Sequence, residues 1–315
     1  MDGVATPNTP FCTASSFSGA FFFSGLFFFS SLTGFLTRFY LLRLKPNYIQ
    51  TFLGRLQRRP SVKYIGHVAL MRIPLRFEGN VEEEAERILS SHKNVKTVVL
   101  IEGVEGVYRV PKTKVVAGMP VTETLHRENG LVYRVDVKKL MFSLGNSLER
   151  RRMRNLPRPG EVVVDMFAGV GQFTIPAAKS QAEKVYAFEI NPEAYRYLVE
   201  NIRLNKVDHK VVTFLDDCKN APVHGLGASA DRVIMGYFPG TLEYLPTALK
   251  LAKPDGCYIH FHELAQPTDG WKKLFESCKE TAASHGFYLE LQNVRAVKTY
   301  SPKLWHWVLD LRACL

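Results

Sequence analysis

Apolar and polar residues alternate along the chain in two rhythms, and the change between them divides the sequence. After residue 60, the apolar runs KYIGHVALMRIP, TVVLIEG and GVYRVPKTKVVAG each predict a strand. VEEEAERILSSH has the spacing of an amphipathic helix, with acids in its first turn where the helix dipole favours them. TETLHRENGLVYRVDV predicts a hairpin that turns at Glu128-Asn129-Gly130. Together these elements predict a small α+β domain over residues 61–136.

From Pro157 onward, predicted strands and helices alternate. The pattern predicts strands over EVVVDMFAG, KVYAFEIN, VVTFLDD, DRVIMGYF and GCYIHFHEL. It predicts helices over QFTIPAAKS and PEAYRYLVENIRLNKV. This alternation predicts an α/β fold with a doubly wound, Rossmann-like, mostly parallel sheet. The last run, GFYLELQNVRAVKTYSPKLWHWVLDLRAC, predicts a C-terminal antiparallel hairpin that completes the sheet. We expect this Rossmann-like domain to occupy residues 137–315.

The first 60 residues follow neither rhythm. No charged residue occurs from Gly3 to Thr37, where phenylalanine clusters alternate with serine and glycine. The run is long enough to span a bilayer, with the basic residues from Arg38 onward on the cytoplasmic side. Serine and glycine dilute its hydrophobicity, so a disordered extension or a non-native leader explains it as well. Membrane association of residues 1–40 therefore stays an open alternative.

Charge and cysteine content narrow the class of protein. The 315 residues carry a formal net charge of +11, which favours a polyanionic partner, although a merely basic protein has the same composition. The five cysteines are scattered without a CxxC pair. This pattern argues against a disulfide framework and a zinc site, and it predicts a protein of the reducing cytoplasm that needs no metal.

The glycine turn in VVVDMFAGVGQFT predicts a nucleotide cofactor. Asp165 ends the strand, and Gly169 and Gly171 allow a ligand to approach the backbone. A dinucleotide site would have a third glycine where Thr174 stands, and an acid before the turn suits a cationic ligand better than a diphosphate. S-adenosylmethionine, with its sulfonium and ammonium groups, meets that requirement.

More acids follow the next two predicted strands. Glu189 can accept both ribose hydroxyl protons, and Asp217, with Cys218 beside it, lies where such folds read the adenine edge. Because the carboxyl ends of parallel strands share one edge of the sheet, we expect these residues to lie together. The alternative is that the acids are ordinary surface-loop residues. The sequence thus predicts an S-adenosylmethionine site made of Asp165, Gly169, Gly171, Glu189, Asp217 and Cys218.

A basic segment, DVKKLMFSLGNSLERRRMRNLPRPG, precedes the cofactor strand. Its part SLERRRMRN predicts a helix, and the face could simply be solvated, as charge runs often are. Its place directly before the cofactor strand favours contacts with the phosphates of a nucleic acid. The candidate substrate contacts are Lys138, Lys139, Arg151, Arg152 and Arg154.

Several motifs in fixed order resemble a known family. The chain resembles the tRNA guanosine-37 N1-methyltransferase and wybutosine-synthesis aminocarboxypropyltransferase superfamily. The motifs that carry the resemblance are TETLHRENGLVYRVDV, FSLGNSLERRRM, DMFAGVGQFTIPAA, FEINPEAYRYLVENIRLNKV, DRVIMGYFP and WHWVLDLR. The resemblance covers about Lys63 to Arg312. It implies a class I S-adenosylmethionine-dependent transferase that modifies tRNA.

The two branches of that superfamily differ at two places in this chain. The methyltransferase branch is expected to have Arg-Leu before its Glu-Arg pair and an Asn-Leu-Pro loop, but here Gly145-Asn146 and Gly236-Tyr237-Phe238-Pro239 stand. Both departures resemble the other branch. The implied reaction moves the 3-amino-3-carboxypropyl group of S-adenosylmethionine to C7 of 4-demethylwyosine at position 37 of tRNA-Phe. The alternatives are N1 methylation of guanosine 37 and a membrane-tethered RNA-binding protein without activity.

The resemblance also suggests residues around the transferred group. Tyr237, Phe238 and Pro239 are positioning candidates that shape an apolar slot for the base, and no general base is assigned. Ser143 and Arg150 are candidates to hold the amino-acid arm of the cofactor or its carboxylate, together with Asn146. Helix or turn capping explains Ser143 and Asn146 equally well. His260 and His262 face one side of a predicted strand and could approach the cofactor, although we favour structural or substrate-contact roles for them.

Overall fold

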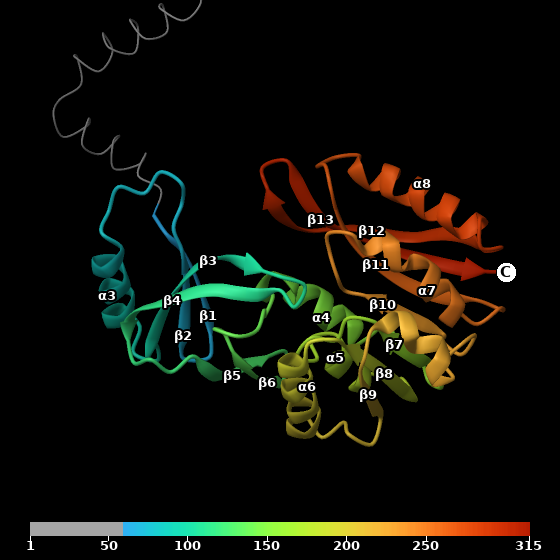
Figure 1. Cartoon of the computed structure of the whole chain (residues 1–315), viewed down its shortest axis with the longest axis horizontal. Coiled ribbons are helices and arrows are strands. Elements are labelled where there is room, and N and C mark those ends of the chain that lie inside the picture. Colours follow the sequence, from blue (N-terminus) through green and yellow to red (C-terminus); the bar gives the residue numbers. More distant parts are fainter. Residues whose placement is uncertain (1–58) are drawn as a thin grey trace, which may run out of the picture. The chain divides into compact units, whose positions relative to one another are not determined.

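The computed structural model describes residues 59–315, which form one compact unit (Figure 1). The predictions for the apolar N-terminal run therefore lie outside the described residues. Within the described residues, no helix combines the length and apolar character that crossing a bilayer requires.

A four-stranded sheet in the order β1-β2-β3-β4 begins the described chain. Its strands are β1 (Ser61–Ile65), β2 (Val68–Arg72), β3 (Thr97–Glu105) and β4 (Val110–Gly118), and helix α3 (Val81–Ser91) packs against them. Asn80 caps α3 by accepting a hydrogen bond from the Glu83 amide, and Ala85 and Ile88 are buried. The predicted helix and the predicted strands over β3 and β4 are confirmed.

The prediction of one strand over KYIGHVALMRIP was wrong, because the run folds into the antiparallel pair β1 and β2. Gly66 makes the turn with a φ of +52°. A Cβ atom there would lie 2.1 Å from Thr124 Oγ1, so the turn and the close packing both require glycine. A glycine inside an apolar run was the signal for this break.

The predicted hairpin is confirmed as β5 (Glu123–Glu128) and β6 (Leu131–Asp136), which turn at Asn129-Gly130. Two asparagines bind the free edge of β6: Asn201 in helix α6 (Pro192–Leu204) and Asn205, the C-cap of that helix. The Asn201 amide group bonds both the N–H and the C=O of Arg134, and Asn205 does the same for Val132. These bonds satisfy backbone groups of β6 that no strand pairs, and they fix the hairpin to helix α6.

The seven-stranded sheet has the order β12-β13-β11-β10-β7-β8-β9. The strands are β7 (Val162–Asp165), β8 (Lys184–Glu189), β9 (Val211–Leu215), β10 (Arg232–Met235), β11 (Cys257–Ala265), β12 (Tyr288–Ser301) and β13 (Leu304–Cys314). β7 to β11 run parallel, and the hairpin β12–β13 is antiparallel. The chain starts in the middle at β7, winds outward through β8 and β9, and then returns to β10. The predicted doubly wound fold and C-terminal hairpin are confirmed, with the switch point between β7 and β10.

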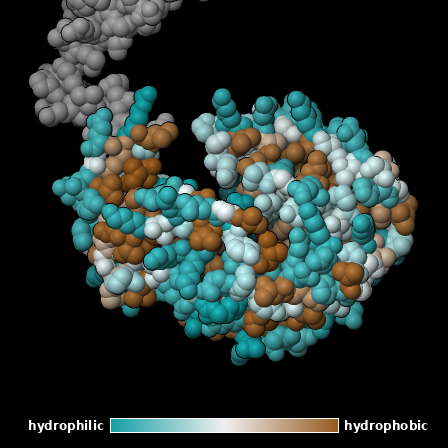
Figure 2. All heavy atoms as spheres, viewed as in Figure 1, coloured by the Kyte–Doolittle hydropathy of each residue, from teal (hydrophilic) through white to brown (hydrophobic). Residues whose placement is uncertain are grey.

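Both faces of the central strands are covered. Along β7, Val163 belongs to the apolar cluster on the side of α6, and Val164 belongs to the cluster on the side of α7 (Leu245–Leu251) and α8 (Gly270–Ala283). Successive strand residues point to opposite faces, so a run such as EVVVD fills two cores at once. In Figure 2, hydrophilic residues are interspersed with smaller apolar groups over the side that carries α7 and α8.

Candidate cofactor and substrate site

The glycine turn lies between β7 and helix α5 (Thr174–Ala178), at the switch point of the sheet. Gly169 and Gly171 have φ values of +56° and +93°, which side chains disfavour. A Cβ atom on Gly171 would lie 2.7 Å from Ile175 Cδ1, whereas one on Gly169 would meet no atom within 4 Å. Gly171 thus serves packing, and Gly169 faces open space that a ligand can enter.

Asp165 braces this turn from beneath. Its side chain is fully buried and accepts hydrogen bonds from the Thr174 hydroxyl at 2.7 Å and from the Phe167 amide at 3.3 Å. Burial raises the pKa of Asp165 to about 6. We expected this carboxylate to face a cationic ligand, but its bonds are made to the turn itself.

Glu189 ends β8 and reaches across to the turn. One carboxylate oxygen accepts from the Gly169 amide at 2.7 Å, and the other accepts from the Asn191 amide at 2.8 Å. Burial raises the pKa of Glu189, although the side chain keeps part of its surface exposed. Each carboxylate oxygen has a second lone pair, so Glu189 can still accept hydroxyl protons of a ligand.

Asp217 and Cys218 follow β9, at the same edge of the sheet. Asp217 caps the short 3-10 helix η2 (Cys218–His224) by accepting from the Lys219 amide at 2.9 Å. The Cys218 side chain is buried in the core that contains Phe188. The structure thus brings the predicted acids to the carboxyl ends of β7, β8 and β9, as expected.

Ser143 and Arg150 lie on a segment that closes over the turn. The Ser143 amide donates to Gln172 Oε1 at 3.0 Å, and Gln172 directly follows Gly171. Arg150 donates to both carboxylate oxygens of Glu128, at 2.7 and 2.6 Å, to the Ser143 carbonyl at 2.7 Å and to Gln172 at 3.1 Å. Four of the five guanidinium N–H groups are therefore in use, and a two-point grip of a ligand carboxylate is closed to Arg150.

The loop after β10 is built from aromatic rings. Tyr237 stacks on Phe167 with ring centroids 5.0 Å apart, and Phe238 lies over His306 at 4.2 Å. Glu263 holds the far end of the loop by accepting from the Gly240 and Thr241 amides, both at 2.8 Å.

The small sheet also reaches this loop. Arg109, between β3 and β4, donates to the Phe238 carbonyl and lies 5.5 Å from the centre of the Tyr237 ring. Sequence reasoning missed Arg109 and Glu263, because both come from elements distant in the chain and no local pattern marks them.

Of the two histidines of β11, His262 approaches the segment that follows the glycine turn, because its ring centroid lies 5.2 Å from that of Phe173. His260 is buried between Asp310, at 2.6 Å, and Arg232, at 2.8 Å, while His262 contacts His306 at 3.0 Å. Burial lowers the pKa of both imidazoles. His260, on β11, therefore links Arg232 of β10 to Asp310 of β13. His262 contacts His306, and the ring of His306 lies against the ring of Phe238.

Two comparisons decide the family. The model of the TRM5/TYW2 methyltransferase domain matches residues 124–290. The tRNA(Phe) (4-demethylwyosine(37)-C(7)) aminocarboxypropyltransferase of Pyrococcus horikoshii is 39% identical over 251 residues, which cover 79% of this chain and 87% of that protein. The chain belongs to the TRM5/TYW2 family.

Other members of the TRM5/TYW2 family agree with this result. The tRNA (guanine(37)-N(1))-methyltransferase Trm5b of Pyrococcus abyssi is 38% identical over 253 residues, covering 80% of this chain and 74% of that protein. The crystal structure of P. horikoshii TYW2 in complex with MeSAdo has a TM-score of 0.71 and 33% identity, and it covers 90% of this chain and 99% of that one.

The glycine turn of this TRM5/TYW2 family member fits S-adenosylmethionine. Open space lies beyond Gly169, and the carboxylates of Glu189 and Asp217 follow at the ends of the next two strands. The predicted cofactor is confirmed for the family.

The predicted basic residues differ in their partners. Lys138, Arg151 and Arg154 are exposed, and Arg151 and Arg154 donate hydrogen bonds to Asn129 at 3.4 and 2.9 Å. Lys139 pairs with Glu193 at 2.8 Å, and Arg152 is held by Glu149 and Asp310, both at 2.7 Å, with only 14% of its side chain exposed. Arg152 is thus a structural bridge between helix α4 (Ser147–Met153) and β13, and of the five predicted contacts it is the least available to a phosphate.

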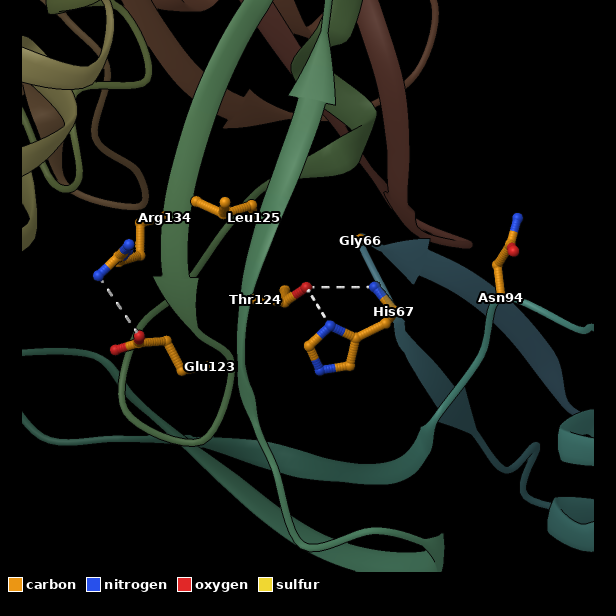
Figure 3. A pocket seen from close by; sticks show the side chains of 7 residues that line it. All are labelled: Gly66, His67, Asn94, Glu123, Thr124, Leu125 and Arg134. Carbon is orange, nitrogen blue, oxygen red and sulfur yellow. Dashed lines mark hydrogen bonds and ion pairs between the residues drawn. The ribbon is translucent and has the colours of Figure 1, made fainter.

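A separate hollow of about 450 Å³ lies where the small sheet meets the hairpin (Figure 3). Thr124 lies at its centre, where Thr124 Oγ1 accepts from the His67 amide at 3.1 Å and contacts His67 Nδ1 at 2.9 Å. Glu123 and Arg134 face each other at 3.9 Å on its other side. None of the predicted cofactor residues lines this hollow, so we assign the cofactor to the glycine turn on chemical grounds.

Proposed function

We propose that this enzyme transfers the 3-amino-3-carboxypropyl group of S-adenosylmethionine to C7 of 4-demethylwyosine at position 37 of tRNA-Phe, in wybutosine biosynthesis. The observation that carries the proposal is the loop after β10. Gly236, Tyr237, Phe238 and Pro239 offer aromatic and apolar surface, the hydroxyl of Tyr237 as their one polar side-chain group, and no carboxylate, imidazole, amine or amide. Such a loop suits a tricyclic base that supplies its own nucleophilic carbon.

Each residue at the glycine turn has a separate proposed role in binding the cofactor. Gly169 gives the backbone approach, Glu189 takes the ribose, and Asp217 with Cys218 lies at the adenine. Asp165 and Gly171 keep the turn in shape, as their buried contacts support. Ser143 lies towards the amino-acid arm, and Arg150 positions Ser143 through the carbonyl bond and offers the arm one N–H.

When bound, S-adenosylmethionine would supply a sulfonium whose neighbouring carbons are open to attack: the C7–Cγ bond would form as the Cγ–S bond breaks, with methylthioadenosine as the leaving group and the C7 proton passing to water. The protein contributes position. The ring of Tyr237 is fixed by Phe167, the ring of Phe238 by His306, and the loop backbone by Glu263. Holding reactants in line replaces a catalytic base as the source of rate.

The anticodon region of tRNA-Phe is the proposed partner of the exposed basic residues. Lys138, Arg151 and Arg154 lie on the segment between the hairpin and β7, so a strand bound there passes the mouth of the cofactor site. We further propose that residues 61–136 act as a tRNA-binding domain joined to the catalytic residues 137–315. Scattered free cysteines favour action in a reducing cytoplasm.

The second candidate is N1 methylation of guanosine 37. The 38% identity to the P. abyssi methyltransferase supports it. It requires groups that handle the guanine proton, and the loop Gly236–Pro239 offers only the Tyr237 hydroxyl among its side chains, with no carboxylate, imidazole or amide.

Cofactor labelling separates the two reactions. Purified enzyme is incubated with tRNA-Phe that carries 4-demethylwyosine, and with tRNA-Phe that carries guanosine 37, using S-adenosylmethionine labelled at the methyl or at the carboxyl carbon. We expect carboxyl label on the wyosine substrate, and methylthioadenosine as co-product by mass spectrometry. Methyl label on guanosine 37, with S-adenosylhomocysteine released, would establish the sister activity.

A further inference from the structure

Lys298, on β12 near the C-terminus, contacts the predicted cofactor residue Ser143 and its neighbour Asn146. Its ammonium donates to Ser143 Oγ at 2.6 Å and to Asn146 Oδ1 at 2.9 Å, and it lies 5.8 Å from the centre of the Phe238 ring. One of the three N–H groups of the ammonium is left for another partner. Lys298 therefore joins the predicted arm residues to the predicted base slot.

Gly145 makes room for this lysine. A Cβ atom at position 145 would lie 2.7 Å from Lys298 Cδ and 3.3 Å from Nζ. The neighbouring Asn146 supplies the acceptor. The pair Gly145-Asn146, which distinguishes this sequence from the methyltransferase pattern, thus has a physical reason: both residues accommodate Lys298.

The ammonium lacks a counterion among residues 59–315. Both of its described partners are neutral oxygens, and the charged groups that act on it most strongly are Lys63, Arg150, Arg109 and Arg72, all cations. Burial and these cations lower the pKa of Lys298 to about 8. A half-buried cation in a positive environment favours the arrival of an anion.

Its position indicates which anion. Ser143, the residue that Lys298 touches, is tied by its amide to Gln172 at the end of the glycine turn. Arg150, the other cation there, already serves the Glu128 carboxylate. The only anionic group of S-adenosylmethionine is the carboxylate of its amino-acid arm, and the proposed function places that arm between the turn and Phe238.

We propose that the Lys298 ammonium binds the carboxylate of the cofactor's amino-acid arm and thereby positions the arm for transfer. This inference rests on the proposed function, since it assigns a residue to the transferred group. It makes Lys298 a positioning residue that favours carboxypropyl over methyl transfer, because a fixed carboxylate restrains the rotation of the arm.

Calorimetry with two ligands tests the assignment without turnover. S-adenosylhomocysteine keeps the arm and its carboxylate, whereas methylthioadenosine lacks both. For Lys298→Met we expect at least a tenfold loss of affinity for S-adenosylhomocysteine and a change within twofold for methylthioadenosine. Lys298→Arg keeps the charge and is expected to lose less. Unchanged methylthioadenosine binding shows that the variant is folded.

The pH dependence adds a second readout. The ammonium is charged below its pKa, so the wild-type preference for S-adenosylhomocysteine over methylthioadenosine should weaken as pH rises through about 8. In Lys298→Arg the preference should persist over the same range, because the guanidinium stays charged.

Other outcomes distinguish a failure of the Lys298 assignment from a failure of the proposed function. Equal affinity of Lys298→Met and wild type for S-adenosylhomocysteine would overturn the inference, and a selective loss of tRNA affinity would assign Lys298 to a phosphate instead. If the wild type binds neither nucleoside, the proposed function itself fails. If the wild type binds both and carries out methyl transfer only, the proposed function fails while the lysine contact stands.

Discussion

At the residue scale, the carboxylate of Glu189 is the link between the glycine turn and the second strand. Its two oxygens accept the Gly169 and Asn191 amides and keep lone pairs free for a ribose. Hydrogen bonds to a charged group contribute about 1.5–3 kcal/mol each. Glu189→Ala should therefore weaken S-adenosylhomocysteine binding by about 10- to 100-fold in calorimetry.

The matched control is Glu183→Ala, which removes an exposed acid just before the same strand. Its affinity should equal that of the wild type. Glu189→Ala with native circular dichroism and unaltered affinity would refute the ribose assignment.

A second residue, Glu128, carries a buried ion pair. Burial raises its pKa, but the hydrogen bonds from Arg150 and the His126 imidazole 3.6 Å away outweigh this effect and lower the pKa to about 2. A carboxyl whose pKa is depressed on folding stabilises the protein above its unfolded pKa, and this contribution is lost as pH falls towards about 2. Glu128→Gln leaves Arg150 unpaired and should lower the free energy of unfolding by about 3–5 kcal/mol at pH 7.

Urea unfolding from pH 7 down to pH 2 measures this contribution. The gap between wild type and Glu128→Gln should be widest above pH 4.5 and shrink below it. A gap that is constant with pH would mean that the pair contributes no electrostatic stability.

At the element scale, the loop between β10 and α7 depends on β11. Glu263 holds the Gly240 and Thr241 amides, and removal of its carboxylate frees the loop that carries Tyr237 and Phe238. Because small displacements of aligned groups reduce rate steeply, kcat of Glu263→Ala should fall by about 10- to 100-fold.

Affinity for S-adenosylhomocysteine should stay within twofold, since Glu263 makes no contact with the glycine turn. Glu290→Ala, an exposed acid on β12, serves as the control with normal kcat. If Glu263→Ala keeps full kcat, the loop is positioned by its aromatic contacts alone.

Most elements could be predicted from the sequence because their apolar spacing is local. EVVVD and KVYAFE are buried on two faces, and PEAYRYLVENIRL has one apolar stripe, so each pattern predicts one kind of element. The predicted acids followed from the rule that ligands bind at the carboxyl ends of strands. The break at Gly66 was missed because its need for glycine arises from Thr124, 58 positions later in the chain.

The rest of the site could not be predicted, for the same reason of distance. Lys298 and Ser143 are 155 residues apart, and Arg109 and Phe238 are 129 apart. Their meeting depends on the length and twist of the hairpin β12–β13 and on the small sheet. Arg150 shows the same limit, since its sequence position suggested a ligand contact but gave no sign of the Glu128 carboxylate that takes two of its N–H groups.

At the scale of the whole molecule, the net charge of +11 predicts that tRNA binding depends on salt. Each lost phosphate contact should reduce the slope of log K against log salt by about 1. The double variant Arg151→Ala/Arg154→Ala should thus lower the slope by about 2 and weaken binding in filter or anisotropy assays.

The control is Lys272→Ala/Lys273→Ala, which removes the same charge from the exposed face of α8. Its slope should match the wild type if the contacts are local. Equal effects of the two double variants would show that overall charge, and not the α4 face, attracts the tRNA.

The amide groups of Asn201 and Asn205 along β6 have a consequence beyond catalysis. A two-stranded hairpin normally leaves an open side on which a strand of another molecule can dock and begin aggregation. Here side chains from a helix occupy that side in place of a third strand. The same bonds that fasten the hairpin to α6 therefore also close the β6 edge to such docking.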